Sequence, residues 1–377
     1  MATETQRIYV LDCLRFIGVT FALFSHAALT LELYSGTGSG QALKLMTRTA
    51  TPTLLILFGI MIEIAYTRRF DRSPRDAIRR TIHRSIECYL ALTLAAALMI
   101  VKNDIPTFFN QVVLAEPVTN FEIYRLYSLL LLAVPALLLL RQRLGPIGYA
   151  IPIVLIGGYH VLFAASRPLA APLTEWGALL GIGGLRGPSL VHSVGLVLVG
   201  MCAGTYFSRS HVRSGLVALV ASIVTAASVV AWGLLSLGPD KFANGITDIS
   251  QFRNHNSPYY FAYGIVSMLP LFCAAMSISI VRQRHIQDAI TIVGGNTFSY
   301  FFVGNLFLAA ISIAAPKSGW AGLIVIPAAI AATLVWVLFQ RRFPKIKAVK
   351  DAAILWFVDL LVRKPAATSA QPQDIKA

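Results

Sequence analysis

The first apolar segment of the chain carries three residues that could do chemistry inside a membrane: Asp12, Arg15 and His26. Arg15 and His26 are eleven residues apart, which on a helix places them on one face with about 16 Å of rise between them. Asp12 lies three residues before Arg15 and joins that face. Histidine suits a general base near neutral pH, and ionisable residues inside a bilayer usually serve a pathway or a reaction. Alternatively, Asp12 and Arg15 neutralise one another and His26 is an interfacial histidine.

A second group of polar residues is expected on the same side of the membrane as His26. Arg48 precedes an apolar segment and could hold a polar acceptor or an oxyanion. Glu122 and Arg125, with Tyr127 beside them, begin a later segment and are, together with Arg48, the candidate substrate-binding residues. These residues also fit ordinary helix starts and an interfacial aromatic belt. Other residues on this side suit a carbohydrate surface or any membrane interface: Tyr159, His160, Arg186, His192, Asp240, Arg253, His255, Tyr259 and Tyr260.

The segment 68–84 is rich in arginine and includes Arg69, Arg72 and Arg75. A planar guanidinium group can form two parallel hydrogen bonds to the oxygens of one phosphate. The segment could therefore hold the phosphates of a cofactor. It could equally be a basic loop that only fixes the orientation of the protein in the membrane.

Composition places these residues in a membrane protein, because the 377-residue chain is 56% hydrophobic and 13% charged with a mean hydropathy of +0.68. We expect an all-α, polytopic membrane helical bundle of about ten transmembrane helices. The predicted helices are 8–31, 51–67, 86–101, 123–140, 144–164, 190–207, 215–237, 258–281, 290–314 and 320–340.

The net charge of +15 does not indicate a nucleic-acid partner, because the basic residues concentrate in alternate loops. Under the positive-inside rule these loops and both termini are cytoplasmic, as expected for a multi-pass protein of the inner (cytoplasmic) membrane. We expect one transmembrane domain over 1–350, a cytoplasmic surface helix over 351–364 and a disordered tail over 365–377. Neither the cysteines nor any other spacing predicts a metal site or a disulfide, and no nucleotide-binding, serine hydrolase or zincin motif is present.

Four segments together resemble the acyltransferase-3 family of membrane acyltransferases, and within it the branch related to glucan succinyltransferases. The family opening L-D-x-L-R with R-x10-H is similar to Asp12, Arg15 and His26. An R-x-x-x-P stretch followed by R-x-x-R is similar to Arg48 through Gly59 with Arg69 and Arg72. The remaining likeness is carried by two runs: Tyr124 to Pro135, and Val293 to Tyr300 with Phe301 and Phe302.

The resemblance implies O-acyl transfer, of acetyl or succinyl type, from cytoplasmic acyl-CoA to a hydroxyl of a cell-surface or periplasmic carbohydrate. Its expected partners are acyl-CoA, the carbohydrate and membrane lipid. His26 would be the base, with Arg15 and Asp12 as the other catalytic residues. The CoA phosphates would bind Arg69, Arg72 and Arg75, and the pantetheine arm would follow the stripe from Arg15.

The chain departs from the family pattern at two places. Phe58 stands where the family has serine before glycine, and a late histidine is replaced near Gly304 and Asn305, which removes a candidate polar contact. A different class of function remains open, namely a proton-coupled transporter or flippase that uses Asp12, Arg15 and His26 as a relay. A non-enzymatic scaffold would leave those charges unexplained.

Overall fold

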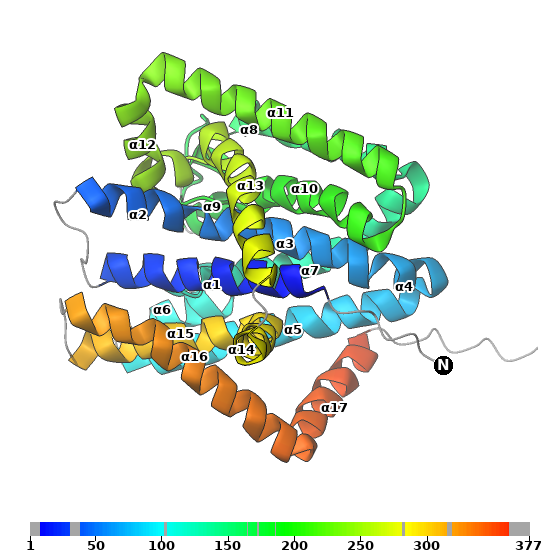
Figure 1. Cartoon of the computed structure of the whole chain (residues 1–377), viewed down its shortest axis with the longest axis vertical. Coiled ribbons are helices and arrows are strands. Elements are labelled where there is room, and N and C mark those ends of the chain that lie inside the picture. Colours follow the sequence, from blue (N-terminus) through cyan, green and yellow to red (C-terminus); the bar gives the residue numbers. More distant parts are fainter. Residues whose placement is uncertain are drawn as a thin grey trace, which may run out of the picture.

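The computed structural model describes residues 8–30, 38–101, 104–163, 165–171, 173–184, 186–280, 283–314 and 319–361. Across those residues every regular element is helical, and most of the helices form one bundle (Figure 1). The α-helices are α1 (Tyr9–Thr30), α2 (Gly38–Arg48), α3 (Ala50–Ala65), α4 (Thr67–Arg72), α5 (Pro74–Leu98), α6 (Ile105–Val112), α7 (Glu122–Leu144), α8 (Ala150–Phe163), α9 (Thr174–Leu180), α10 (Leu190–Ser208), α11 (Val212–Leu237), α12 (Pro239–Thr247), α13 (Pro258–Ile280), α14 (Arg284–Gly295), α15 (Thr297–Ala314), α16 (Gly319–Arg342) and α17 (Pro344–Leu361). The short helical turns are η1 (Met99–Val101), η2 (Pro146–Tyr149), η3 (Ile182–Gly184) and η4 (Ile249–Arg253).

Six helices are long and apolar enough to cross a membrane, or seven if the bent pair of α14 and α15 is one span. They are α1, the run Gly40–Arg72 through α2 to α4, α7, α10, α11 and α13. The other predicted spans correspond to shorter or more polar helices. The segment expected at 86–101 is the second half of α5, whose first half carries arginines, whereas α8 and Ile324–Gln340 of α16 are shorter apolar helices. The chain is therefore an all-helical membrane protein.

The centre of the bundle is the contact of α3 with α10, and α1 packs against α3. Gly200 of α10 explains the close approach, because a Cβ there would overlap the backbone carbonyl of Ile56. Apolar side chains from α1, α3, α7 and α10 fill the core around this contact. In Figure 1 these helices run parallel to α11, which forms one margin of the bundle.

The single helix predicted over 290–314 is wrong, because α14 and α15 meet at a bend of 84°. Gly294 lies so close to α1 that a Cβ would overlap the carbonyl oxygen of Asp12. At the break, the side-chain amide of Asn296 donates a 2.7 Å hydrogen bond to the Ile292 carbonyl. Figure 1 shows α14 end-on while α15 runs across the view. The bend lets α15 pack along α1, and this contact positions the site described below.

The helix near the C-terminus begins earlier than the predicted surface helix at 351–364. It is α17, which starts at Pro344 and packs against α5. The predicted tail over 365–377 lies outside the described residues.

Candidate active site

A cavity of about 190 Å³ lies at the end of the bundle where α2 and α12 are found, on the left of Figure 1. Its walls come from the last turns of α1, α2 and η4, the first turns of α3, α7 and α13, and Phe301 of α15. His26, Arg48 and Glu122 all line this cavity. The structure thus brings together three predicted site residues that are far apart in the sequence.

His26 is held by Asn305 of α15. The Nδ1 atom of His26 lies 2.8 Å from Oδ1 of Asn305, and the ring edge of Phe301 packs on the imidazole with centroids 5.7 Å apart. The Nδ2 amide of Asn305 donates to the Phe301 carbonyl at 2.9 Å, so the amide oxygen faces the histidine. Because that oxygen only accepts hydrogen bonds, Nδ1 of His26 carries the proton and Nε2 is the basic nitrogen.

The sequence reasoning treated position 305 as the loss of a polar contact, and this interpretation is wrong. Asn305 supplies a polar partner to His26 itself. The arrangement of a base oriented by a side-chain acceptor is the one that nucleophilic and acyl-transfer enzymes use. The bend before α15 is what aligns the two residues, which are 279 positions apart in the chain.

Arg253 and Tyr260 complete the polar wall of the cavity. Arg253 forms a 3.0 Å ion pair with Glu122 and a hydrogen bond with Tyr260, whose hydroxyl also bonds to Thr51. Burial lowers the pKa of the Arg253 guanidinium, but Glu122 and Tyr260 together outweigh burial and leave that pKa above its usual value. In the sequence, Arg253 and Tyr260 are two of many polar residues expected on this side. Only the folded structure identifies them as residues that line the cavity.

Arg48 is buried, with 9% of its surface exposed, and lines the same cavity. Its Nε donates to the Thr247 carbonyl and its Nη1 to the Ser25 hydroxyl, each at 3.2 Å. Both partners are neutral. Arg48 therefore connects α1 and α12 and also places a positive charge beside His26.

Arg125 and Tyr127, which the sequence grouped with Glu122, do not line the cavity. Arg125 is buried and donates to the backbone carbonyls of Leu114 and Ala115 at 3.4 and 3.5 Å. Tyr127 donates to the Leu54 carbonyl at 2.9 Å, and its ring stacks on Phe58 with centroids 4.8 Å apart. Phe58 thus fills space against an aromatic neighbour.

Asp12 and Arg15 form a 3.1 Å ion pair near the opposite end of α1 from His26. Between them and His26 the predicted polar stripe is interrupted. Val19 and Ala22 are 2% and 5% exposed and belong to an apolar cluster formed with α3, α7 and α15. The structure therefore shows two separate polar sites on α1 rather than one continuous track.

The arginine-rich segment forms α4 and the first half of α5. Arg72 and Arg75 are exposed. Arg80 and Arg84, which are also exposed, and the half-buried Arg69 lie near the side chain of Tyr66. Partial burial and the nearby guanidinium of Arg69 lower the pKa of Arg80. Arg84 is paired with Glu87, so the positive potential that an anion would relieve comes from Arg69 and Arg80. The sequence identified the segment but not which of its arginines converge.

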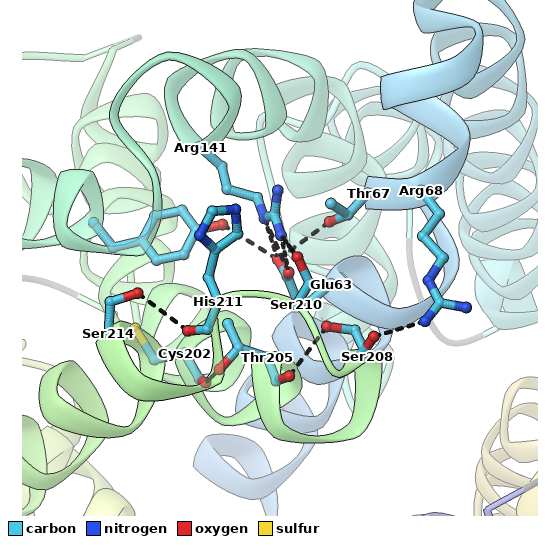
Figure 2. Close-up of polar contacts among 11 residues, drawn as sticks. Glu63, Thr67, Arg68, Arg141, Cys202, Thr205, Ser208, Ser210, His211 and Ser214 are labelled. Atoms are coloured by element: carbon cyan, nitrogen blue, oxygen red, sulfur yellow. Dashed lines mark hydrogen bonds and ion pairs between the residues drawn. The ribbon is translucent and has the colours of Figure 1, made fainter.

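Glu63, an acidic residue in an apolar helix, belongs to a separate buried network shown in Figure 2. Its carboxylate accepts two 2.9 Å hydrogen bonds from Nε of Arg141, and Nη2 of Arg141 lies 2.7 Å from it. Thr67 and Tyr149 donate to the same carboxylate, and Arg141 also reaches Ser210. The network joins α3, α4, α7, η2 and the α10–α11 connection. Every polar partner in it is satisfied, so its role is structural.

A second acidic group lies where α17 contacts α5. One ligand atom from each of His83, Glu87 and Asp351 lies within 4.8 Å of the others, a spacing at which a metal ion could fit. Arg84 forms an ion pair with Glu87, so a cation already occupies that carboxylate. Glu87 is also 3.8 Å from His83, so its contacts are explained by ion pairing within α5.

No protein-family model matches the chain, and no curated protein sequence matches it significantly. The structure alone therefore defines the class: an all-helical membrane protein with a small polar cavity built around an oriented histidine.

Proposed function

We propose that the protein is a membrane-embedded O-acyltransferase. It moves an acetyl- or succinyl-type group from cytoplasmic acyl-CoA to a hydroxyl of a cell-surface or periplasmic carbohydrate. In this proposal it is a multi-pass protein of the inner membrane with both termini in the cytoplasm, and the His26 cavity faces the far side. The observation that carries the proposal is the hydrogen bond between His26 and Asn305, which leaves a basic nitrogen beside a polar cavity.

In the proposed reaction, Nε2 of His26 takes the proton of the acceptor hydroxyl while the hydroxyl oxygen attacks the thioester carbonyl. The tetrahedral oxyanion meets the positively charged wall of the cavity, where Arg48 and the Tyr260 hydroxyl lie. Arg15 is too far along α1 for this role. Collapse of the intermediate breaks the carbon–sulfur bond, and the imidazolium returns its proton to the leaving thiolate of CoA.

The donor would enter from the arginine-rich end, with its phosphates on the Arg69, Arg80 and Arg84 cluster. Its pantetheine arm must then pass the packed section of α1 at Val19 and Ala22. We propose that α1 separates from α15 along this section when the donor binds. The side chains of Val19 and Ala22 are apolar and form no polar contact, but the opening breaks the 3.1 Å hydrogen bond between the hydroxyls of Thr20 in α1 and Tyr300 in α15.

The test compares His26→Gln with His255→Gln. His255 is an exposed histidine on the same predicted side. Full-length protein in lipid nanodiscs is given acetyl-CoA or succinyl-CoA with periplasmic glycan extract, and mass spectrometry follows acylation of the glycan. Loss of a general base should lower transfer by roughly 10²- to 10⁴-fold, while His255→Gln should match the unmodified protein. Full transfer by a folded His26→Gln protein would rule out the assignment.

The alternative of a proton-coupled transporter or flippase has less support. A relay through Asp12, Arg15 and His26 needs hydrogen-bonded steps, but Val19 and Ala22 separate the first two residues from the third. Uptake or lipid transfer that depends on a proton gradient in reconstituted vesicles would favour this alternative.

A further inference from the structure

The two arginines that line the cavity differ in how their charges are balanced. Arg253 has a carboxylate partner, Glu122, at 3.0 Å. Arg48 bonds only to a backbone carbonyl and a hydroxyl, those of Thr247 and Ser25. Among the residues that the structure describes, none forms an ion pair with Arg48. Within the described part of the chain, the cavity wall therefore carries one positive charge without a carboxylate partner, on the residue that bonds to the neighbour of His26.

The nearest acidic group that influences Arg48 does not neutralise it by contact. This group is Asp248, which is exposed. Its carboxylate already accepts hydrogen bonds from Ser250 and Gln251. Asp248 thus caps the start of η4 and is not among the residues that line the cavity.

A purely structural role explains the position of Arg48 but not its charge. Two neutral acceptors can be bonded by a neutral amide, and a guanidinium that is only 9% exposed has lost most of its hydration. Buried charges in proteins are normally paired or meet a charged ligand. A transient oxyanion does not supply this partner, because it exists only during the reaction. The resting cation needs a partner that arrives with the substrate.

We infer that Arg48 is a carboxylate-binding residue beside His26 and that the natural ligand of the cavity carries a carboxylate group. The inference rests on the proposed function and narrows its substrate class. Nε and Nη1 of Arg48 each hold one neutral acceptor, so three of the five guanidinium N–H groups have no protein partner in the described chain. These groups can bind a carboxylate through two parallel hydrogen bonds. The hydroxyl of Tyr260 then remains to stabilise the oxyanion of the tetrahedral intermediate.

The carboxylate has two possible sources. It can be the free end of a dicarboxylic acyl group on the donor, or the acid group of a uronic acid in the acceptor. The recognition chemistry is the same in both cases, so paired probes that differ in the charged group separate them. Succinyl-CoA is compared with butyryl-CoA, which has an acyl chain of equal carbon number without the carboxylate. Glucuronate is compared with glucose.

Binding of each probe to full-length protein in nanodiscs is measured by calorimetry, for the unmodified chain, Arg48→Gln, Arg48→Lys and Arg143→Gln. Arg143 is an exposed arginine in the last turn of α7, whose first turn lines the cavity, and serves as the control. In at least one pair the carboxylate-bearing probe should bind roughly 10- to 100-fold more tightly, as expected for a hydrogen bond between charged groups. Arg48→Gln should abolish this preference, Arg48→Lys should keep part of it, and Arg143→Gln should leave it unchanged.

Two results would overturn the inference: equal binding within both pairs, or a preference that survives in Arg48→Gln. If both CoA esters bind equally, the donor function stands and the glucuronate pair decides the inference. If neither ester binds, acyl-CoA is not the donor, and the comparison of glucuronate with glucose then decides whether Arg48 binds a carboxylate. Arg48→Lys protects the test against misfolding, because it keeps the charge and the bond to Ser25.

Discussion

The ion pair of Glu63 with Arg141 allows a prediction of stability whose size follows from the structure. Arg141→Met removes the guanidinium but keeps an apolar side chain of similar length. Glu63 is fully buried and would lose its ion-pair partner, retaining only the donors Thr67 and Tyr149. Removing one partner of a buried pair destabilises a protein by about 3–5 kcal/mol. We expect the lower end, about 3 kcal/mol, because the two remaining donors still stabilise the carboxylate.

The assay is a double-mutant cycle measured by denaturant unfolding in detergent micelles. Glu63→Leu combined with Arg141→Met should recover at least about half of the loss, because an apolar pair of similar volume often replaces a buried ion pair without penalty. Arg143→Met, at an exposed position on the same helix, should change stability by less than about 0.5 kcal/mol. The reasoning is refuted if Arg141→Met behaves like Arg143→Met, or if the double variant is as unstable as the sum of the single ones.

Three further predictions concern the proposed reaction. Asn305→Leu should lower acyl transfer by roughly 10- to 100-fold. Asn305→Asp should retain more activity, because it keeps an acceptor for Nδ1 of His26. Equal losses in the two variants would contradict the assignment of the proton to Nδ1. Arg69→Gln with Arg80→Gln should raise KM for acyl-CoA by roughly tenfold or more with kcat unchanged, and Arg213→Gln, an exposed control, should not; an unchanged KM would leave the segment with a role in topology only. Val19→Cys, in a background with Cys273 replaced by serine, should react with a soluble maleimide only when acyl-CoA is present, as mass spectrometry of the labelled protein can show; labelling without donor would refute the closed resting path.

The sequence predicts the helices well and their partners poorly, for a physical reason. Apolar length is a local property, and helical residues appear at every predicted segment, although only six helices, or seven with the bent pair, are long and apolar enough to cross a membrane among the described residues. The partner of Glu63 lies 78 residues away, and that of His26 lies 279 residues away. Neither pairing can be recognised from the residues that neighbour Glu63 or His26 in the sequence. The bend at Asn296 was missed for the same reason, because it depends on the contact of Gly294 with the backbone of α1.

The burial of Val19 and Ala22 changes how the charged residues of α1 should be understood. A continuous polar stripe of about 16 Å would be a route for water and protons, and a transferase that leaked protons would dissipate the membrane potential. Two apolar residues between the Asp12–Arg15 pair and His26 close that route at rest. Separating α1 from α15 exposes the apolar side chains packed between them, Leu23 and Phe301 among them, and breaks the hydrogen bond between Thr20 and Tyr300, so opening the path costs free energy. Donor binding at the arginine cluster could supply that energy, which would couple opening of the membrane barrier to the presence of substrate.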